Sequence, residues 1–372
     1  VDKDIKFTSV IAQCSSDLKV TKPMVKCLPY NKQDNFVTDW YTNISSYVSP
    51  DFSKNLFVDK RWNINKNLKR VEYALYNADL SQVIKKGKYT AQYREEVEGK
   101  LVSNSGDVFF VLYFDGWGKS KVKEDSYYKI IKIDTTGNVS ERKIKHEKLF
   151  YISSFLSFDN NGNLVLYMQS SIDYENKNFI GIHTVKLNQN LEVIYDKYYD
   201  FSKYGVSQNQ LYIAWMKDVH FDDFGNSYLV MYEQGVNYSD GNVMGYCSDY
   251  YVMKFDEQGE SKFVSVIPHL DVTPESQSFK SALFNNTLYL LHNNPENNID
   301  LKESQKQATK GLKYKDRALV LTKFNKDGTF STSKVASQNE MIGLSLFNSF
   351  VLENDNMFVL KLKNKIGIIK VP

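Results

Sequence analysis

Two residues in the second half of the chain have side chains suited to acid and base chemistry. Asp218 and His220 stand just before the turn segment FDDFG, and a carboxylate beside an imidazole can form an acid/base pair. Hydrolysis of a glycosidic bond would need a second, facing carboxylate, which the sequence does not place. The alternative is that His220 is a strand histidine satisfied by local hydrogen bonds.

The sequence contains no pattern that indicates a metal or a cofactor. The five histidines form no HxH or HExxH pair, and the three cysteines form no CxxC pair. The Asp/Asn clusters lack the spacing of a calcium loop, and GxSxG, P-loop and GxGxxG segments are absent. Cys14 and Cys27 either form a disulfide, if neighbouring strands bring them together, or are buried as small hydrophobic residues. We therefore expect neither a metal nor a cofactor.

Aromatic residues in long polar segments suggest a partner-binding surface. Trp117 lies between two glycines in the segment DGWG, and Tyr174, Tyr204, Tyr238 and Tyr246 lie in comparable segments. Tryptophan and tyrosine are typical of protein and carbohydrate recognition surfaces. The alternative is that these rings anchor their own loops or cover an interface between neighbouring units of the fold.

Composition narrows the class of protein. The 372 residues include 47 Lys+Arg and 44 Asp+Glu, and basic residues are not concentrated in one region, so we expect no nucleic-acid partner. No run of 18 apolar residues would cross a membrane as a helix. The chain begins at Val1 without Met, which suggests an exported protein in the periplasm, at the outer membrane or outside the cell. The 26 Tyr and 23 Phe favour strands over helices.

One pattern recurs along the chain: an alternating apolar segment, a short Asp/Asn/Gly cluster and a second alternating segment. Asp or Asn at the first turn position hydrogen-bonds its own backbone, and Gly or Asn accepts the positive φ of the turn. Each copy therefore predicts a β-hairpin. One set of copies is centred on Gly106, Gly162, Gly225, Asn286 and Asp355, and an interleaved set on Asn65, Thr135, Gln189, Glu257 and Lys326.

Two hairpins per repeat give four antiparallel strands, which is the blade of a β-propeller. We predict an all-β, six-bladed propeller that forms a single domain over residues 1–372. The last stretch supplies only three strands, so we expect segment 4–12 to add the outer strand and close the ring. Seven blades remain an alternative, because the first 35 residues are weakly patterned. The predicted blades end near Tyr76, His146, Tyr199, Ile267 and Ala336.

This repeat resembles the six-bladed β-propeller superfamily, in particular the TolB-like and NHL-like propellers of exported bacterial proteins. The resemblance rests on DNNGN (159–163), DDFGN (222–226) and DTTGN (134–138), and it covers nearly the whole chain. WD, kelch and Asp-box motifs are absent, so the resemblance implies the architecture and no catalytic residue.

In a fold of this kind the short turns lie at one end and the long connections at the other. We expect function at the long-loop end, because variable loops on a rigid scaffold commonly carry it. Residues 293–316 form a polar insertion that we expect to be mobile or ordered by a partner. The long connections are predicted at residues 85–100, 114–126, 170–178, 200–210, 233–249 and 292–316.

Two classes of function follow from these observations. The leading hypothesis is a non-catalytic protein-binding scaffold, an accessory subunit of a bacterial cell-envelope assembly, which contacts its protein partner through Trp117 and the loop tyrosines. The alternative is a carbohydrate-active or lyase-type enzyme, or a glycan or small-ligand binder. In that case Asp218 and His220 would lie at the mouth of the central channel that the blades of a propeller surround.

Overall fold

The computed structural model describes about two thirds of the chain. The described residues are 10–11, 25–26, 37–38, 45–63, 68–92, 94–114, 126–146, 149–171, 180–204, 214–239, 242–267, 269, 279–295, 317–337, 350–352, 355–361 and 366–371.

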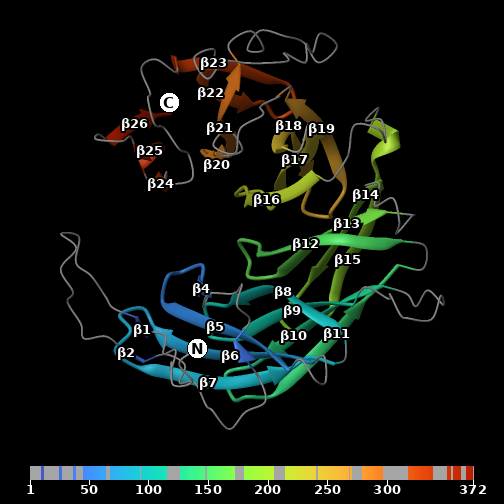
Figure 1. Ribbon diagram of the computed structural model, residues 1–372, viewed down its shortest axis with the longest axis vertical. Helices are drawn as coiled ribbons and strands as arrows, with labels where there is room; N and C mark the ends of the chain where they lie inside the picture. Colours follow the sequence, from blue (N-terminus) through green and yellow to red (C-terminus); the bar gives the residue numbers. More distant parts are fainter. Residues whose placement is uncertain are drawn as a thin grey trace. The chain divides into compact units, whose positions relative to one another are not determined.

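In these residues the fold is all-β apart from one short 3-10 helix, η1 (Phe201–Tyr204). Six antiparallel sheets of three to five strands follow one another along the sequence, as the colours of Figure 1 show. This is the topology of a six-bladed β-propeller, and it confirms the predicted fold class. A short pair of strands, β1 (Val10–Ile11) and β2 (Val25–Lys26), precedes the six sheets.

The strands of each sheet pair with their neighbours in chain order, except that β3 and β4 both pair with β5. The first two sheets comprise β3 (Val37–Thr38), β4 (Ser45–Val48), β5 (Lys54–Asn63), β6 (Leu68–Asn77) and β7 (Val83–Thr90), then β8 (Glu95–Val102), β9 (Val108–Phe114), β10 (Tyr127–Ile133) and β11 (Val139–Ile144). The third and fourth comprise β12 (Phe150–Phe158), β13 (Leu164–Ser171), β14 (Gly181–Leu187) and β15 (Val193–Asp200), then β16 (Ala214–Phe221), β17 (Ser227–Ser239), β18 (Asn242–Phe255) and β19 (Ser261–Ile267). The fifth and sixth comprise β20 (Phe279–Phe284), β21 (Thr287–Pro295), β22 (Arg317–Phe324) and β23 (Phe330–Ser337), then β24 (Phe350–Leu352), β25 (Met357–Lys361) and β26 (Ile366–Lys370).

The chain divides into two compact units, residues 1–158 with 188–192 and residues 159–187 with 193–372, called here the first and second unit. In the first unit, the first and second sheets pack face to face through residues such as Leu56 and Val71 against Val97 and Phe110. In the second unit, the fourth and fifth sheets pack in the same way, with Val230 and Val252 among the buried residues. Facing sheets exclude water from both sides of their middle strands, which explains the continuous apolar segments of those strands.

The tight turns are closed by the side chain of their own first residue. In the turn that joins β12 and β13, Asp159 Oδ1 accepts hydrogen bonds from the amides of Asn161 (2.9 Å) and Asn163 (2.8 Å). Gly162 has a φ of 76°, a conformation that glycine adopts at no steric cost. The same pattern at Asp134, Asp222 and Asp256 confirms the predicted turn chemistry.

Four of the five predicted blade ends agree with the last strands β11, β15, β19 and β23 to within two residues. The first, at Tyr76, is wrong, because β7 pairs along β6, with Arg70 opposite Thr90 and Leu75 opposite Lys85. The turn between them uses Leu80 at a φ of 58° and contains no glycine, so it lacks the recurring pattern. The turn near Asn65 therefore joins β5 and β6 and is followed by the further strand β7. It is the second turn of the first sheet and not the third.

Two segments predicted as long loops are strands. Residues 85–100 contain most of β7 and β8. Residues 233–249 extend the pairing of β17 and β18 as far as Ser239 opposite Asn242. The predicted polar insertion begins later than expected, because β21 continues to Pro295.

The predicted closure of the ring by segment 4–12 stays a prediction. Among the described residues, Val10 and Ile11 pair with β2, and the sixth sheet has three strands.

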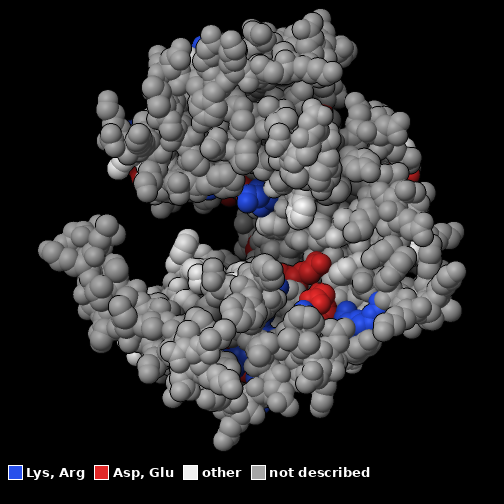
Figure 2. All heavy atoms as spheres, in the orientation of Figure 1, with Lys and Arg blue, Asp and Glu red and all other residues white. Residues whose placement is uncertain are grey.

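Cys14 and Cys27 lie outside the described residues. The described residues contain no helix with the length and apolar character needed to cross a membrane. On the face shown in Figure 2, the few described charged residues in view include both acidic and basic side chains.

Candidate functional site

The structure does not bring the five predicted partner-binding residues together. Trp117 and Tyr174 lie outside the described residues. Tyr204 ends η1, and Tyr238 and Tyr246 lie on the paired strands β17 and β18, opposite Val243 and Gly235. The side chains of these three tyrosines are outside the described part, so the predicted surface stays a prediction.

The predicted pair Asp218 and His220, in contrast, forms part of a hydrogen-bonded site on β16. Ser281, on the first strand of the next sheet, donates its hydroxyl proton to Asp218 Oδ2 over 2.7 Å. Its oxygen lies 2.8 Å from His220 Nε2. Because the serine proton is directed at the carboxylate, the serine oxygen accepts its second hydrogen bond from the imidazole N–H.

A β-bulge brings a third side chain to the same face of β16. Trp215 lies opposite Tyr232, Asp218 opposite Val230 and His220 opposite Tyr228, with the register shift between Met216 and Asp218. Directly opposed residues project to the same side of a sheet, and Tyr232, Val230 and Tyr228 alternate along β17 on one face. Trp215 therefore shares a face with Asp218 and His220, and its side chain is 48% exposed. We call Trp215, Asp218, His220 and Ser281 the β16 site.

The order of groups in the β16 site differs from that of a serine hydrolase. In a serine hydrolase the imidazole stands between the serine and the carboxylate and removes the serine proton. Here the hydroxyl of Ser281 stands between Asp218 and His220, so the imidazole is not placed to remove that proton. The second oxygen of Asp218, Oδ1, has no hydrogen-bond partner among the described residues and remains available as an acceptor.

A related arrangement occurs in the first unit. Glu98, at the bulge of β8, accepts hydrogen bonds at Oε2 from Tyr128 (3.0 Å) and from Ser154 on β12 (2.9 Å). The surrounding protein raises the pKa of the Glu98 carboxyl by limiting its hydration. The sequence did not single out this carboxylate.

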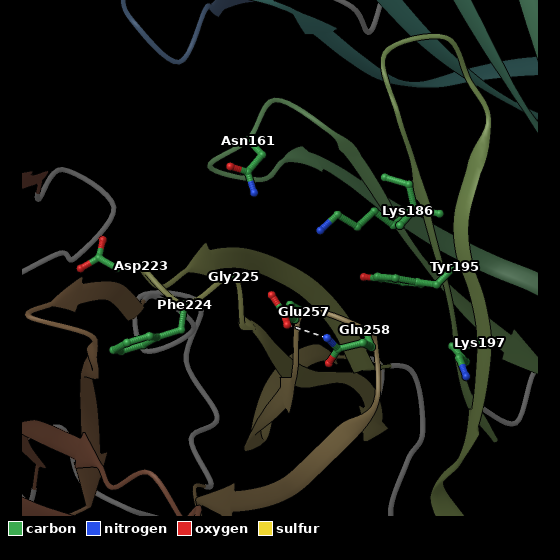
Figure 3. A pocket seen from close by; sticks show the side chains of 10 residues that line it. Asn161, Lys186, Tyr195, Lys197, Asp223, Phe224, Gly225, Glu257 and Gln258 are labelled. Atoms are coloured by element: carbon green, nitrogen blue, oxygen red, sulfur yellow. Dashed lines mark hydrogen bonds between the residues drawn. The ribbon is translucent and has the colours of Figure 1, made fainter.

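A cavity of about 630 Å³ opens among the tight turns of the second unit (Figure 3). Lys186, Tyr195 and Glu257 point toward its interior. Its lysines are neutralised by carboxylates: Lys186 Nζ lies 2.7 Å from Asp159 Oδ2, and Lys197 Nζ lies 2.7 Å from Glu260 Oε1. Because both lysines are paired with carboxylates, neither leaves an unpaired positive charge that would select a ligand. The β16 site is therefore the better candidate. The cavity is lined by Asn161, Lys186, Ile194, Tyr195, Lys197, Asp223, Phe224, Gly225, Glu257 and Gln258.

Sequence reasoning missed Trp215 and Ser281. In a regular strand, residues 215 and 218 would lie on opposite faces. No sequence pattern predicts the bulge that brings both residues to the same face. Ser281 lies 63 residues from Asp218, and only the packing of two sheets connects them. Among the described residues, no group of three or more His, Cys, Asp or Glu side chains is arranged to hold a metal ion.

Comparisons with known proteins give no family for this chain. No family model matches it, and no curated protein matches it. Solved structures resemble it at low identity. A protein of unknown function from Bacteroides caccae is 11% identical, with 88% of this chain and 91% of that one covered, at a TM-score of 0.35.

Two further structures illustrate the same level of similarity. The β-propeller domain of the Trilobed protease from Pyrococcus furiosus is 10% identical, with 87% and 78% of the two chains covered and a TM-score of 0.39. An exo-β-1,3-galactanase from Phanerochaete chrysosporium is 10% identical, with 95% and 74% covered and a TM-score of 0.36. At these scores the likeness supports no statement about activity.

Proposed function

We propose that this protein binds a carbohydrate, or another polyhydroxylated ligand, at the β16 site. One observation carries the proposal: the Ser281 hydroxyl bridges Asp218 and His220 on the face of β16 that also bears the half-exposed ring of Trp215.

The four side chains supply what recognition of a sugar requires. An aromatic ring stacks on the apolar face of a sugar, and a carboxylate accepts hydrogen bonds from neighbouring hydroxyl groups. The hydrogen bonds of Ser281 hold Asp218 and His220 in place before a ligand arrives, which lowers the entropy cost of binding. A site built from fixed polar groups also rejects ligands that lack the matching hydroxyl groups.

The proposal is tested by screening a broad glycan panel and measuring the affinity of each hit by calorimetry. Trp215→Ala and Asp218→Asn should each weaken binding by about 10-fold, through loss of stacking and of a charge-assisted hydrogen bond. Phe224→Ala is the matched control, because Phe224 is an exposed aromatic residue (65%) in the turn beyond the other end of β16. An absence of saturable binding across the panel, or hits indifferent to both variants, would refute the proposal.

The same hits separate a binder from an enzyme. The carbohydrate-active and lyase-type hypotheses predict product formation that is lost in His220→Ala. Binding without product would leave recognition as the role of the β16 site.

A protein-binding scaffold remains a second proposal, supported by an exposed tryptophan on the first strand of the fourth sheet, Trp215. In this role the protein would be an accessory subunit of a bacterial cell-envelope assembly that binds through its long-loop end. Replacing Trp117, Tyr238 and Tyr246 together by Ala should abolish crosslinked capture of the partner while leaving thermal stability nearly unchanged. Capture at the wild-type level would exclude these three residues from the interface.

Both proposals take the chain as one exported propeller domain, residues 1–372, with segment 4–12 completing the last blade. They also retain the proposed relationship to TolB-like and NHL-like propellers.

A further inference from the structure

A lysine of the second sheet is buried without a carboxylate partner. Lys100, on β8, is 7% exposed. Its ammonium group lies 3.3 Å from the hydroxyl of Tyr47 and 5.6 Å from the centre of that ring. Within the described residues no carboxylate lies within 4.0 Å of Lys100, so this buried charge has no anionic partner there.

A second lysine lies on the facing side of the first sheet. Lys60 is opposite Val71 in the β5–β6 register, and Lys100 is opposite Phe110 in the β8–β9 register. Val71 and Phe110 belong to the core cluster between these two sheets. Lys60 and Lys100 therefore project toward each other's sheet, as does Tyr47, which packs against the same cluster.

The electrostatic consequences agree with this placement. Burial, followed by the charge of Lys100, lowers the pKa of Lys60 to about 8. Burial also lowers the pKa of Lys100. The charged forms of both lysines are thus destabilised in the folded protein. A negative charge bound beside them would stabilise both charged forms.

Two glutamates near Lys60 are engaged elsewhere. Glu96 pairs with Lys69, whose Nζ lies 3.4 Å from Glu96 Oε1. Glu98 is held at Oε2 by Tyr128 and Ser154. The buried Lys129, in contrast, has a carboxylate partner, because its Nζ lies 2.6 Å from Glu95 Oε1.

We propose that Lys60, Lys100 and Tyr47 form a binding site for a small oxyanion, namely a carboxylate or phosphate group. Two ammonium groups and a phenol supply converging donors, and the desolvated setting strengthens their attraction for an anion. This inference is independent of the β16 site and concerns the first unit alone.

The test is calorimetric titration of the full-length protein with inorganic phosphate, acetate and sulfate at pH 7, with ionic strength held constant by chloride. Phosphate or acetate should bind saturably, and the relative affinities of phosphate, sulfate and acetate identify the preferred oxyanion. Lys60→Met and Lys100→Met should each weaken binding by at least 10-fold. Lys254→Met is the control, because Lys254 is also buried over a tyrosine ring, 5.0 Å from the centre of Tyr228, but in the second unit.

The pH dependence gives a second readout that a merely structural role would not produce. Affinity should fall between pH 7 and pH 9 as Lys60 loses its proton, and bound phosphate should raise the pKa of Lys60 measured by NMR of labelled lysine. The charged and titratable groups around Lys60 are Lys100, Tyr47, Glu96 and Glu98.

Three outcomes would overturn the proposal. The first is that none of the three anions binds saturably at pH 7. The second is that wild type and both lysine variants bind equally well. The third is that Lys254→Met weakens binding as much as the two lysine variants do. If Lys100→Met does not fold, Lys60→Gln and Tyr47→Phe provide the same comparison, because both residues are only partly buried.

Discussion

Glu98 in the first unit and Asp218 in the second are carboxylates in similar backbone settings with different side-chain surroundings. Glu98 is the extra residue of the bulge in β8, whereas Asp218 directly follows the bulge in β16 and pairs with Val230. Each has one carboxylate oxygen held by a serine from the first strand of the following sheet. The other groups around Glu98 are Tyr128, Lys60 and Glu96. On the Asp218 face of β16 they are the imidazole of His220 and the indole of Trp215. A bulge and a serine of the following sheet thus fix a carboxylate in each unit, and the neighbouring side chains set its electrostatic surroundings.

The two units should respond to acid in opposite directions, and this is the largest effect that we expect. Burial, assisted by the charge of His269, lowers the pKa of His292 in the second unit from 6.5 to about 3. The unfolded chain therefore binds a proton below pH 6.5 that the folded chain refuses, so stability is lost as the pH falls from 6.5 toward 3. The loss should reach about 3 kcal/mol at pH 4. His292→Gln should remove this dependence in urea unfolding measured at several pH values.

Glu98→Gln is the counterpart in the first unit. Because burial raises the pKa of Glu98, its contribution to stability is present below the ordinary glutamate pKa of 4.5 and is lost as the pH rises through the raised value. The variant should therefore gain stability relative to wild type between pH 4.5 and pH 7. If both variants shifted the pH profile in the same direction, the contrast between the units would be wrong.

Removing the bridging serines should give smaller and unequal effects. Ser281 is 6% exposed and makes two hydrogen bonds, so Ser281→Ala should lower the free energy of unfolding by about 2 kcal/mol. Ser154 donates a hydrogen bond to Glu98, which is also held by Tyr128, so Ser154→Ala should cost about 1 kcal/mol or less. Urea unfolding at pH 7 measures both. Equal losses would show that the second hydrogen bond of Ser281 adds nothing.

Much of the fold could be predicted from turn chemistry alone. Asp159, Gly162, Asp222 and Gly225 mark hairpins because an aspartate at the first position and a glycine with positive φ satisfy the turn within five residues. The turns of the first sheet could not be recognised in this way, because Phe52 and Leu80 take the positive-φ positions there. Its last strand, β7, also presents exposed lysines, which resemble a loop in a sequence.

The candidate sites were only partly predictable. Asp218 and His220 were found because they are close in sequence and chemically matched. Ser281, Glu98 and Lys100 owe their roles to contacts between sheets, and contacts of that kind leave no local pattern. Burial is the other missing quantity, since Lys100 and an ordinary surface lysine are indistinguishable in a list of residues.

The bulge in β16 also changes how related sequences should be searched. A regular strand exposes every second residue on one face, so a search for paired functional groups would use a spacing of two. Here Trp215, Asp218 and His220 share a face at spacings of three and then two. The pattern Trp-x-x-Asp-x-His, followed within five residues by an Asx turn that contains glycine, is therefore a compact query for other chains that carry the same surface.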